Sequence, residues 1–333
     1  MSVILQSTDV AFAIDAVREA ALLVRRVQRE MVGAALSKDD KSPVTVADFA
    51  AQAIVAKRLA ERFSWATLIG EESAAALRSP GSRDALDQIV RFVATVAPGC
   101  TADDVCGWID RGAGEPPAVY WTLDPVDGTK GFLRNDQYAV ALALVEEGRV
   151  TIGVLGCPEL EGAERAAKGG AGSVLAAVRG EGTWTQPLDC KAGGAWRRLR
   201  VSSVENAPDA RLLRSVEKAH TDAGGIEDLV RLLGVAADPV SMDSQAKYAV
   251  LAAGGGDAIL RLLSPSRRDY REKVWDQAAG SLVVEEAGGR VSDLDGKALD
   301  FSQGRTLAAN RGVLATNSRL HDAILRGLAQ IRA

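Results

Sequence analysis

The chain has 333 residues, of which 47% are apolar and 25% are charged, and its formal net charge is −4. A chain of this length can bury a sizeable core, either as one large domain or as two lobes. The acidic balance argues against nucleic-acid binding by bulk electrostatics, so any bound phosphate must be met by local positive charge.

The four cysteines and two histidines include no Cys-x-x-Cys pair, which argues against a zinc site built from these residues. Cys100 and Cys106 suggest a redox-sensitive pair or, alternatively, two buried thiols. Asp9 and Asp15 interrupt the first apolar residues, so we expect no signal peptide. No apolar run reaches the ~20 residues that span a membrane. We expect a cytoplasmic protein, or an organellar one if a leader has been removed.

The first half of the chain opens with two helical patterns, from Ser7 to Ala35 and from Val44 to Phe63. Asp48 lies in the first turn of the second helix, where the helix dipole alone would favour a carboxylate. A short strand, Thr67 to Ile69, then runs into Gly70-Glu71-Glu72-Ser73. Paired glutamates in a loop are usually only solvated, but at a strand end after glycine one of them can face a metal ion.

A second strand ends in Asp124-Pro-Val-Asp127-Gly-Thr129, after an excursion with helices predicted from Asp84 to Val96 and from Ala102 to Arg111. Proline fixes φ, and glycine permits a tight turn with positive φ. Two carboxylates held this close are costly unless a cation lies between them, and hard divalent cations choose oxygen ligands. Thr129 follows where the chain can enter a helix whose free N–H groups suit a phosphate. An ordinary Asp-Gly turn is the alternative.

The strands that follow pair as two predicted hairpins, Tyr138–Val145 with Val150–Leu155 and Ser173–Val178 with Thr183–Gln186. Residues 1–197 therefore form an α+β lobe. Residues 198–333 alternate strands and helices and predict an α/β lobe. Its strands are predicted at Leu212–Val216, Asp257–Leu263 and Gly289–Asp293, and its helices at Ile226–Leu233, Gln245–Ala253, Val274–Ala287 and Arg319–Ile331. Because no Gly-rich linker separates the lobes, we expect one packed unit with a cleft.

Three acidic turns need one explanation: Glu71, the pair Asp124 and Asp127, and Asp276 in Trp275-Asp-Gln-Ala-Ala-Gly280. They are far apart in the sequence, and each lies at the end of a predicted element. Metal-dependent sites are commonly assembled in this way from separate parts of a scaffold.

In order and content these motifs resemble the inositol monophosphatase superfamily of Li⁺-sensitive, Mg²⁺-dependent phosphatases. A narrower resemblance, to the 3′(2′),5′-bisphosphate nucleotidases of plants and fungi, rests on Ser42–Asp48, Gly128–Arg134, Ser215–His220, Asp243–Tyr248 and Tyr270–Trp275. The resemblance implies a layered αβαβα sandwich of the sugar-phosphatase type. It also implies hydrolysis of the 3′-phosphate of adenosine 3′,5′-bisphosphate, with 3′-phosphoadenosine 5′-phosphosulfate as a further substrate.

The resemblance also implies roles for the matched positions. The metal ligands for two or three Mg²⁺ ions would be Glu71, Asp124, Asp127, Asp276 and the carbonyl of Val126, while Asp48 would hold a further ion or pair with Thr129. Asp48, Glu71 and Thr129 would orient and deprotonate the attacking water. The substrate would be bound by Gly128, Thr129, His220, Ser244, Lys247, Arg261 and Asp276.

Other interpretations stay open at this point. Lys247 on a helix and Arg261 on a strand edge are otherwise ordinary solvated charges. An inositol polyphosphate 1-phosphatase or inositol monophosphatase is the alternative within the superfamily. A catalytically inactive nucleotide sensor on the same scaffold would predict a broken ligand set, whereas every matched carboxylate and Thr129 are present. We expect a small nucleotide bisphosphate as partner, no nucleic acid and no membrane, and a monomer, with a dimer as the alternative.

Overall fold

The computed structural model describes residues 3–32, 42–190, 194–216, 222–264, 267 and 269–332. Within these ranges the strands form a seven-stranded sheet, a five-stranded sheet and a two-stranded ribbon. The first sheet has the order β1 (Leu68–Gly70), β2 (Val119–Asp127), β3 (Ala139–Glu146), β4 (Arg149–Cys157), β7 (Ser173–Val178), β8 (Gly182–Pro187) and β9 (Arg197–Arg198). The ribbon pairs β5 (Leu160–Glu161) with β6 (Arg165–Ala166). The second sheet has the order β11 (Val240–Ser241), β10 (Leu212–Arg214), β12 (Ala258–Arg261), β14 (Val313–Thr316) and β13 (Arg290–Ser292).

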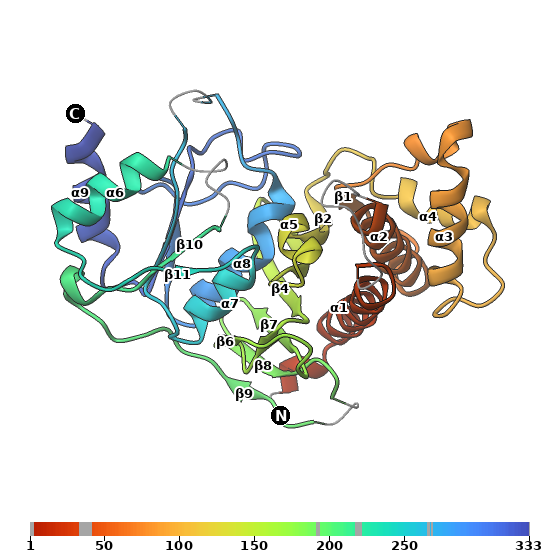
Figure 1. Cartoon of the computed structure of the whole chain (residues 1–333), viewed down its shortest axis with the longest axis horizontal. Coiled ribbons are helices and arrows are strands. Elements are labelled where there is room, and N and C mark those ends of the chain that lie inside the picture. The colour runs from red at the N-terminus through yellow and green to blue at the C-terminus, as the bar shows by residue number, and fades with distance from the viewer. Residues whose placement is uncertain are drawn as a thin grey trace.

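The helices complete a five-layered αβαβα sandwich, which confirms the predicted fold class (Figure 1). One face of the first sheet carries α1 (Thr8–Val27) and α2 (Ser42–Arg62), with α3 (Arg83–Val93) and α4 (Ala102–Asp110) packed on α2. The middle layer between the sheets is α7 (Ala246–Ala252) and α8 (Val274–Glu286). The last layer is α6 (Ala223–Leu233) and α9 (His321–Arg332). The shorter helices are η1 (Val3–Gln6), η3 (Ala76–Arg78), η4 (Pro80–Ser82), α5 (Thr129–Leu133) and η5 (Ala207–Asp209).

Small side chains on one face of the first sheet let the middle layer approach closely. Leu142 and Leu144 of β3 pack toward α1 and α2, whereas Ala141 and Ala143 belong to the core shared with α7 and α8. A Cβ added to Gly153 of β4 would lie 2.9 Å from the carbonyl oxygen of a residue in α8. The alternation of large and small residues along these strands therefore fixes where α8 can lie.

Several predicted boundaries are corrected by the structure. The first helix was expected to reach Ala35, but α1 ends at Val27 and continues as a π-helical turn over Gln28–Val32, beyond which residues 33–35 lie outside the described ranges. The strand β14 was not predicted, although it lies between β12 and β13 in the second sheet. All four cysteines are free thiols.

Within the described ranges, every helix is too short or too polar to cross a bilayer.

Candidate active site

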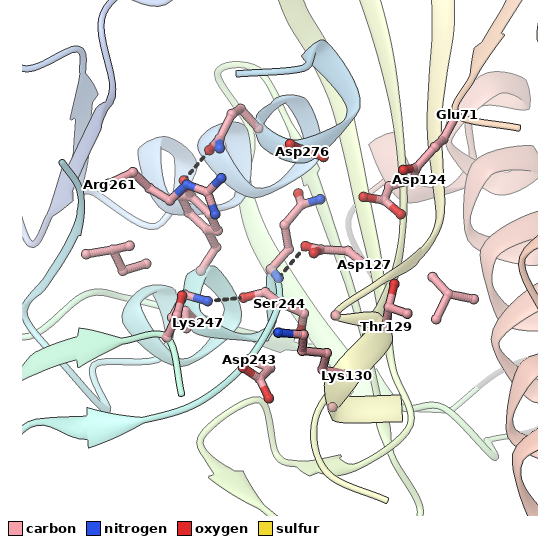
Figure 2. A pocket seen from close by; sticks show the side chains of 18 of the residues that line it. Glu71, Asp124, Asp127, Thr129, Lys130, Asp243, Ser244, Lys247, Arg261 and Asp276 are labelled. Carbon is pink, nitrogen blue, oxygen red and sulfur yellow. Dashed lines mark hydrogen bonds between the residues drawn. The ribbon is translucent and has the colours of Figure 1, made fainter. Parts of the chain in front are cut away.

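A cavity of about 450 Å³ gathers the sequence-predicted site residues, all but Asp48 and His220 (Figure 2). One wall carries the carboxylates of Glu71, Asp124, Asp127 and Asp276, and the opposite wall carries Lys247 and Arg261. Val126, Gly128, Thr129 and Ser244 also line the cavity, together with residues that the sequence had not singled out, among them Lys130, Asp243, Gln245 and Gln277.

A β-bulge places Asp124 and Asp127 on the same face of the first sheet. Residues three apart in a regular strand point to opposite faces. Here Asp124 pairs with Ala141 and Asp127 pairs with Ala139, so β2 has one more residue than β3 across this interval. Both carboxylates therefore face the middle layer. We expected a turn after the strand, whereas β2 continues through Asp127; Pro125, which has no N–H, is tolerated at the bulge.

Glu71 reaches the same edge because β1 and β2 run parallel, with Gly70 beside Leu123. The buried side-chain amide of Gln52 holds Glu72, the residue after Glu71. Gln52 Nε2 donates to the Glu72 carbonyl at 2.7 Å, and Gln52 Oε1 accepts from the Glu72 N–H at 3.0 Å. A Cβ on Gly70 would lie only 2.4 Å from Gln52 Oε1. Glycine is therefore required before Glu71 for this close approach.

The carboxylate wall is electrostatically frustrated. Burial, followed by the charges of Glu71 and Asp127, raises the pKa of Asp124 well above its usual range. Burial and then Glu72 and Asp127 raise the pKa of Glu71 to about 7, although its side chain is open to solvent through the cavity. Burial and then Asp127 raise the pKa of Asp276 to about 8. These groups resist joint ionisation at neutral pH unless a cation compensates them.

The donor set fits a hard divalent cation. Asp124 Oδ1 is buried and has no hydrogen-bond partner, which is costly for a carboxylate oxygen unless a ligand takes that place. Carboxylate oxygens are the ligands that Mg²⁺ prefers. In the part of the chain that the structure describes, no three such side chains already converge as a closed cage. The wall is therefore a set of suitable donors that a bound cation would still have to draw together.

The opposite wall is built around a buried lysine. Lys247 is only 5% exposed, and its ammonium donates to the carbonyls of Ser244 at 2.9 Å and Met242 at 3.4 Å. Burial lowers the pKa of Lys247 to about 8, against the opposing influence of Asp127. All residues of α7 are buried because this helix lies between the two sheets. Lys247 is thus a cation of the cavity rather than a solvated charge.

Arg261 completes this wall and is held by an ion pair. Its Nη2 donates to Glu272 at 2.8 Å, and Glu272 also accepts from Gln277 Nε2 at 2.8 Å. Glu272 is 4% exposed, so the pair is desolvated and oriented. We had assigned no role to Glu272, although it lies within the Tyr270–Trp275 motif that carried part of the resemblance.

Gln245, the residue before α7, binds two parts of the carboxylate wall and was also missed. Its backbone N–H donates to Asp127 Oδ2 at 2.6 Å. Its side chain spans the start of α8: Nε2 donates to the Trp275 carbonyl at 3.1 Å, and Oε1 accepts from the Gly280 N–H at 3.0 Å. The same residue therefore fixes Asp127 and the first turn of the helix that carries Asp276. Its place in Asp243-Ser-Gln-Ala-Lys-Tyr248 was the available signal.

Two predicted site residues, Asp48 and His220, are not among the described residues that line the cavity. Asp48 is 8% exposed, and burial followed by Glu72 and Glu71 raises its pKa well above the usual range. It thus belongs to the acidic cluster from the α2 side, and the structure records no hydrogen bond between Asp48 and Thr129. His220 lies outside the described residues.

Comparison with known proteins agrees with this architecture. The model of the inositol monophosphatase family matches residues 5–333. A 3′(2′),5′-bisphosphate nucleotidase of Emericella nidulans is 38% identical, with 95% of this chain and 96% of the relative covered. The 3′(2′),5′-bisphosphate nucleotidase 1 of Arabidopsis thaliana is 42% identical, with 95% of each chain covered.

Solved structures give the same fold at lower identity. SuhB of Mycobacterium tuberculosis has a TM-score of 0.62 and 22% identity, covering 96% of this chain and 95% of its own. CysQ of Bacteroides thetaiotaomicron has a TM-score of 0.60 and 19% identity, covering 95% of this chain and 99% of its own. The fold is therefore the layered αβαβα sandwich that these structures share. The chain belongs to the inositol monophosphatase family.

Proposed function

We propose that this chain is a Mg²⁺-dependent phosphatase that converts adenosine 3′,5′-bisphosphate to AMP and phosphate. 3′-Phosphoadenosine 5′-phosphosulfate is its second expected substrate. The observation that carries the proposal is one cavity with four carboxylates on one wall and two cations on the other, the buried Lys247 and the half-buried Arg261. A substrate with two phosphate groups needs both walls. The relatives named 3′(2′),5′-bisphosphate nucleotidases support this substrate class.

The carboxylate wall would hold the metal. Its proposed ligands for two or three Mg²⁺ ions are Glu71, Asp124, Asp127, Asp276 and the carbonyl of Val126, with Asp48 supporting a further ion from the α2 side. When bound, Mg²⁺ lowers the pKa of a water molecule and neutralises charge on the leaving oxygen. Such ions would also offset the burial and the mutual repulsion that raise the pKa of these carboxyl groups.

The residues next to this wall would position the reacting groups. The backbone N–H groups of Gly128 and Thr129 would bind the scissile phosphate. Thr129, Glu71 and Asp48 would orient the attacking water, and a carboxylate of this set would accept its proton. Phosphoryl transfer requires mainly positioning and charge stabilisation, which a rigid bulged strand can provide without a covalent nucleophile.

The cationic wall would bind the rest of the nucleotide. Lys247 has one N–H left after its two carbonyl contacts, and Arg261 is oriented by Glu272. Together with Ser244 and His220 they would bind the second phosphate and the ribose. Residues 1–197 and 198–333 would then be a metal-binding lobe and a nucleotide-binding lobe. A monomer stays our expectation, with a dimer as the alternative.

The test is phosphate release from three substrates: adenosine 3′,5′-bisphosphate, its 5′-phosphosulfate relative and an inositol bisphosphate. We expect release from the two nucleotides to require Mg²⁺, to stop with excess chelator and to be inhibited by Li⁺. Equal release in the presence of chelator would contradict the metal mechanism. Faster release from the inositol substrate would instead support the inositol polyphosphate 1-phosphatase alternative.

Asp127→Ala tests the central motif in the same assay. We expect this change to abolish turnover, because Asp127 lies on the bulge beside Asp124 and is held by the Gln245 N–H. If the variant folds and keeps full activity, the proposed role of Asp127 as a metal ligand is wrong.

A further inference from the structure

Arg305 makes an unusual set of contacts beside the carboxylate wall. Its Nη2 donates to the Gly70 carbonyl at 2.6 Å, and its Nη1 donates to the carbonyls of Gly112 at 3.2 Å and Gly114 at 2.8 Å. Its guanidinium carbon also lies 4.9 Å from the ring centroid of Trp275. A single side chain thus contacts the residue before Glu71 and the residue before Asp276.

The backbone around Arg305 is fixed to the same region. The Val274 N–H donates to the Arg305 carbonyl at 3.2 Å, and Lys273 pairs with Thr306 in an isolated antiparallel bridge. The Leu307 N–H in turn donates to the Glu272 carbonyl at 2.9 Å. The segment that carries Arg305 is therefore attached to the start of α8, and the Arg305 side chain reaches across to the end of β1.

The contacts at the end of β1 leave little freedom for another arrangement. The Gly70 N–H already donates to the Gly112 carbonyl at 2.9 Å, so that the Gly70 and Gly112 backbones are paired before Arg305 binds them. A Cβ on Gly112 would lie 2.7 Å from Gln52 Nε2. Gln52 thus holds the backbone of this acidic turn from α2, and Arg305 holds it from the side of α8.

The choice of arginine fits this bridging position. A guanidinium is planar and carries several N–H donors in a fixed fork, and it stacks well on an aromatic ring. A lysine has one compact ammonium and cannot hold both sets of carbonyls while covering the Trp275 face. In the described part of the chain no carboxylate forms an ion pair with Arg305, so its donors are used on carbonyl oxygens.

We propose that Arg305 is a positioning residue that holds the Glu71 turn against the Trp275–Asp276 step and thereby sets how well the carboxylate wall binds Mg²⁺. Arg305 is not among the residues that line the cavity, so it would contact neither metal nor substrate. Glu71 and Asp276 lie far apart in the sequence, and the Arg305 side chain links the Gly70 carbonyl to the Trp275 ring. This inference rests on the metal site of the proposed function.

The test is Arg305→Lys, which keeps the charge and removes the fork. Mg²⁺ affinity is measured by calorimetry and by the rise in melting temperature that Mg²⁺ causes, with no substrate present. We expect roughly 10-fold weaker Mg²⁺ binding, as is typical when the support behind a metal ligand is lost. The Mg²⁺ concentration for half-maximal phosphatase activity should rise by the same factor. The KM for nucleotide at saturating Mg²⁺ should stay close to that of the unchanged chain.

Arg179→Lys is the matched control at the other end of α8. Arg179 Nε donates to the Val150 carbonyl at 2.7 Å, and its Nη2 donates to Glu285 at 2.9 Å, so it too joins the first sheet to this helix. Its variant should lose some metal-free stability and keep its Mg²⁺ affinity. A merely structural role for Arg305 would produce the same pattern in both variants.

The outcomes separate this proposal from the proposed function. If the unchanged chain does not bind Mg²⁺, both are wrong. If the unchanged chain binds Mg²⁺ and Arg305→Lys binds it equally well, only the positioning role is wrong. Should Arg305→Lys not fold, Trp275→Leu applies the same test, because it removes the aromatic face and keeps the carbonyl that Gln245 binds. Unchanged Mg²⁺ affinity in that variant overturns the proposal.

Discussion

The carboxylate wall and the cationic wall of the cavity differ in how their polar groups are satisfied. On the carboxylate wall, Asp124 Oδ1 is buried without a partner, and burial, followed by neighbouring charges, raises the pKa of Glu71 and Asp276. On the cationic wall, Lys247 donates to two carbonyls and Arg261 is paired with Glu272. The carboxylate wall thus has polar groups without partners in the protein, whereas the cations of the other wall are held by hydrogen bonds and an ion pair.

This difference assigns different tasks to the walls. Groups that repel one another and lack partners gain most from a bound cation, which suits them to carry the chemistry. Groups whose partners are internal are held in place before a ligand arrives, which suits them to recognise it with little loss of entropy. Changes on the first wall should therefore affect turnover, and changes on the second should affect substrate affinity.

Asp124→Asn should have the largest effect on activity. The amide keeps the size of the side chain but removes its negative charge. Metal-assisted catalysis depends on such charges for several kcal/mol of transition-state stabilisation, so we expect kcat to fall about 10³-fold. The melting temperature of the metal-free protein should be equal or higher, because burial and neighbouring charges disfavour an ionised carboxylate at this position and the amide is neutral. Phosphate release and a thermal melt with and without Mg²⁺ measure both. A large fall in metal-free stability would show that the wall is not frustrated.

Lys247→Met should act mainly on affinity. Losing one charge-assisted hydrogen bond should raise the KM for adenosine 3′,5′-bisphosphate roughly 10- to 100-fold. The KM for inositol 1-phosphate, which has no second phosphate, should change much less. Lys168→Met is the control, since Lys168 is exposed and pairs with Asp136 at 2.7 Å. If Lys247→Met raised the KM for both substrates equally, the assignment of substrate binding to the cationic wall would be wrong.

Gly128→Ala tests the point where the walls meet. Gly128 has φ of +93°, and an added Cβ would lie 2.8 Å from Ser244 Cβ. We expect a loss of about 1–2 kcal/mol from the backbone conformation alone and a few-fold rise in nucleotide KM from the displaced Ser244. Gly99→Ala carries the same kind of backbone penalty, with φ of +80° and no atom within 4 Å of the added Cβ. Steady-state kinetics and thermal melts of the two variants separate strain from contact, since Gly99→Ala should retain normal kinetics.

The sequence was sufficient to predict the sandwich and ten of the twenty residues that line the cavity, because those predictions rest on local motifs. Asp124 to Thr129 and Trp275 to Gly280 keep their residue types and spacing, so the acidic residues could be grouped before any coordinates were known. The bulge was not predictable in this way. Asp-Pro-x-Asp-Gly is typical of a turn, and only the pairing with β3 keeps these residues in a strand.

Contacts that depend on tertiary structure were missed for a common reason. The helix that carries Lys247 is buried on all sides, so no amphipathic pattern marks its functional side. Glu272 meets Arg261 across a loop, and Arg305 lies in a segment without periodicity that meets Gly70 from the far end of the chain. Such partners are set by how layers pack, which a single sequence does not encode locally.

The smallest expected effect on activity lies outside both walls, in the packing of α9 on the second sheet. His321 is fully buried, and its Nε2 lies 2.9 Å from Ser292 Oγ, whose proton goes to the Asp293 carbonyl at 2.7 Å. Nε2–H must therefore be the donor, and Nδ1 accepts from Thr316 Oγ1 at 3.0 Å. A second proton on Nδ1 would remove that acceptor.

Burial, followed by the charge of Arg290, accordingly lowers the pKa of His321 to about 4. Because the unfolded chain binds this proton near pH 6.5, the contribution of His321 to stability is complete above that pH and is lost as the pH falls toward 4. The loss is about 1.4 kcal/mol for each unit by which folding lowers the pKa. Thermal melts of the metal-free protein between pH 7 and pH 4 should show this decline, and His321→Gln should flatten it without changing nucleotide KM at pH 7. A decline of equal slope in that variant would show that His321 is not the source of the acid sensitivity, and the carboxylate wall cannot be its source either, because carboxyl groups with a raised pKa favour the folded chain as the pH falls.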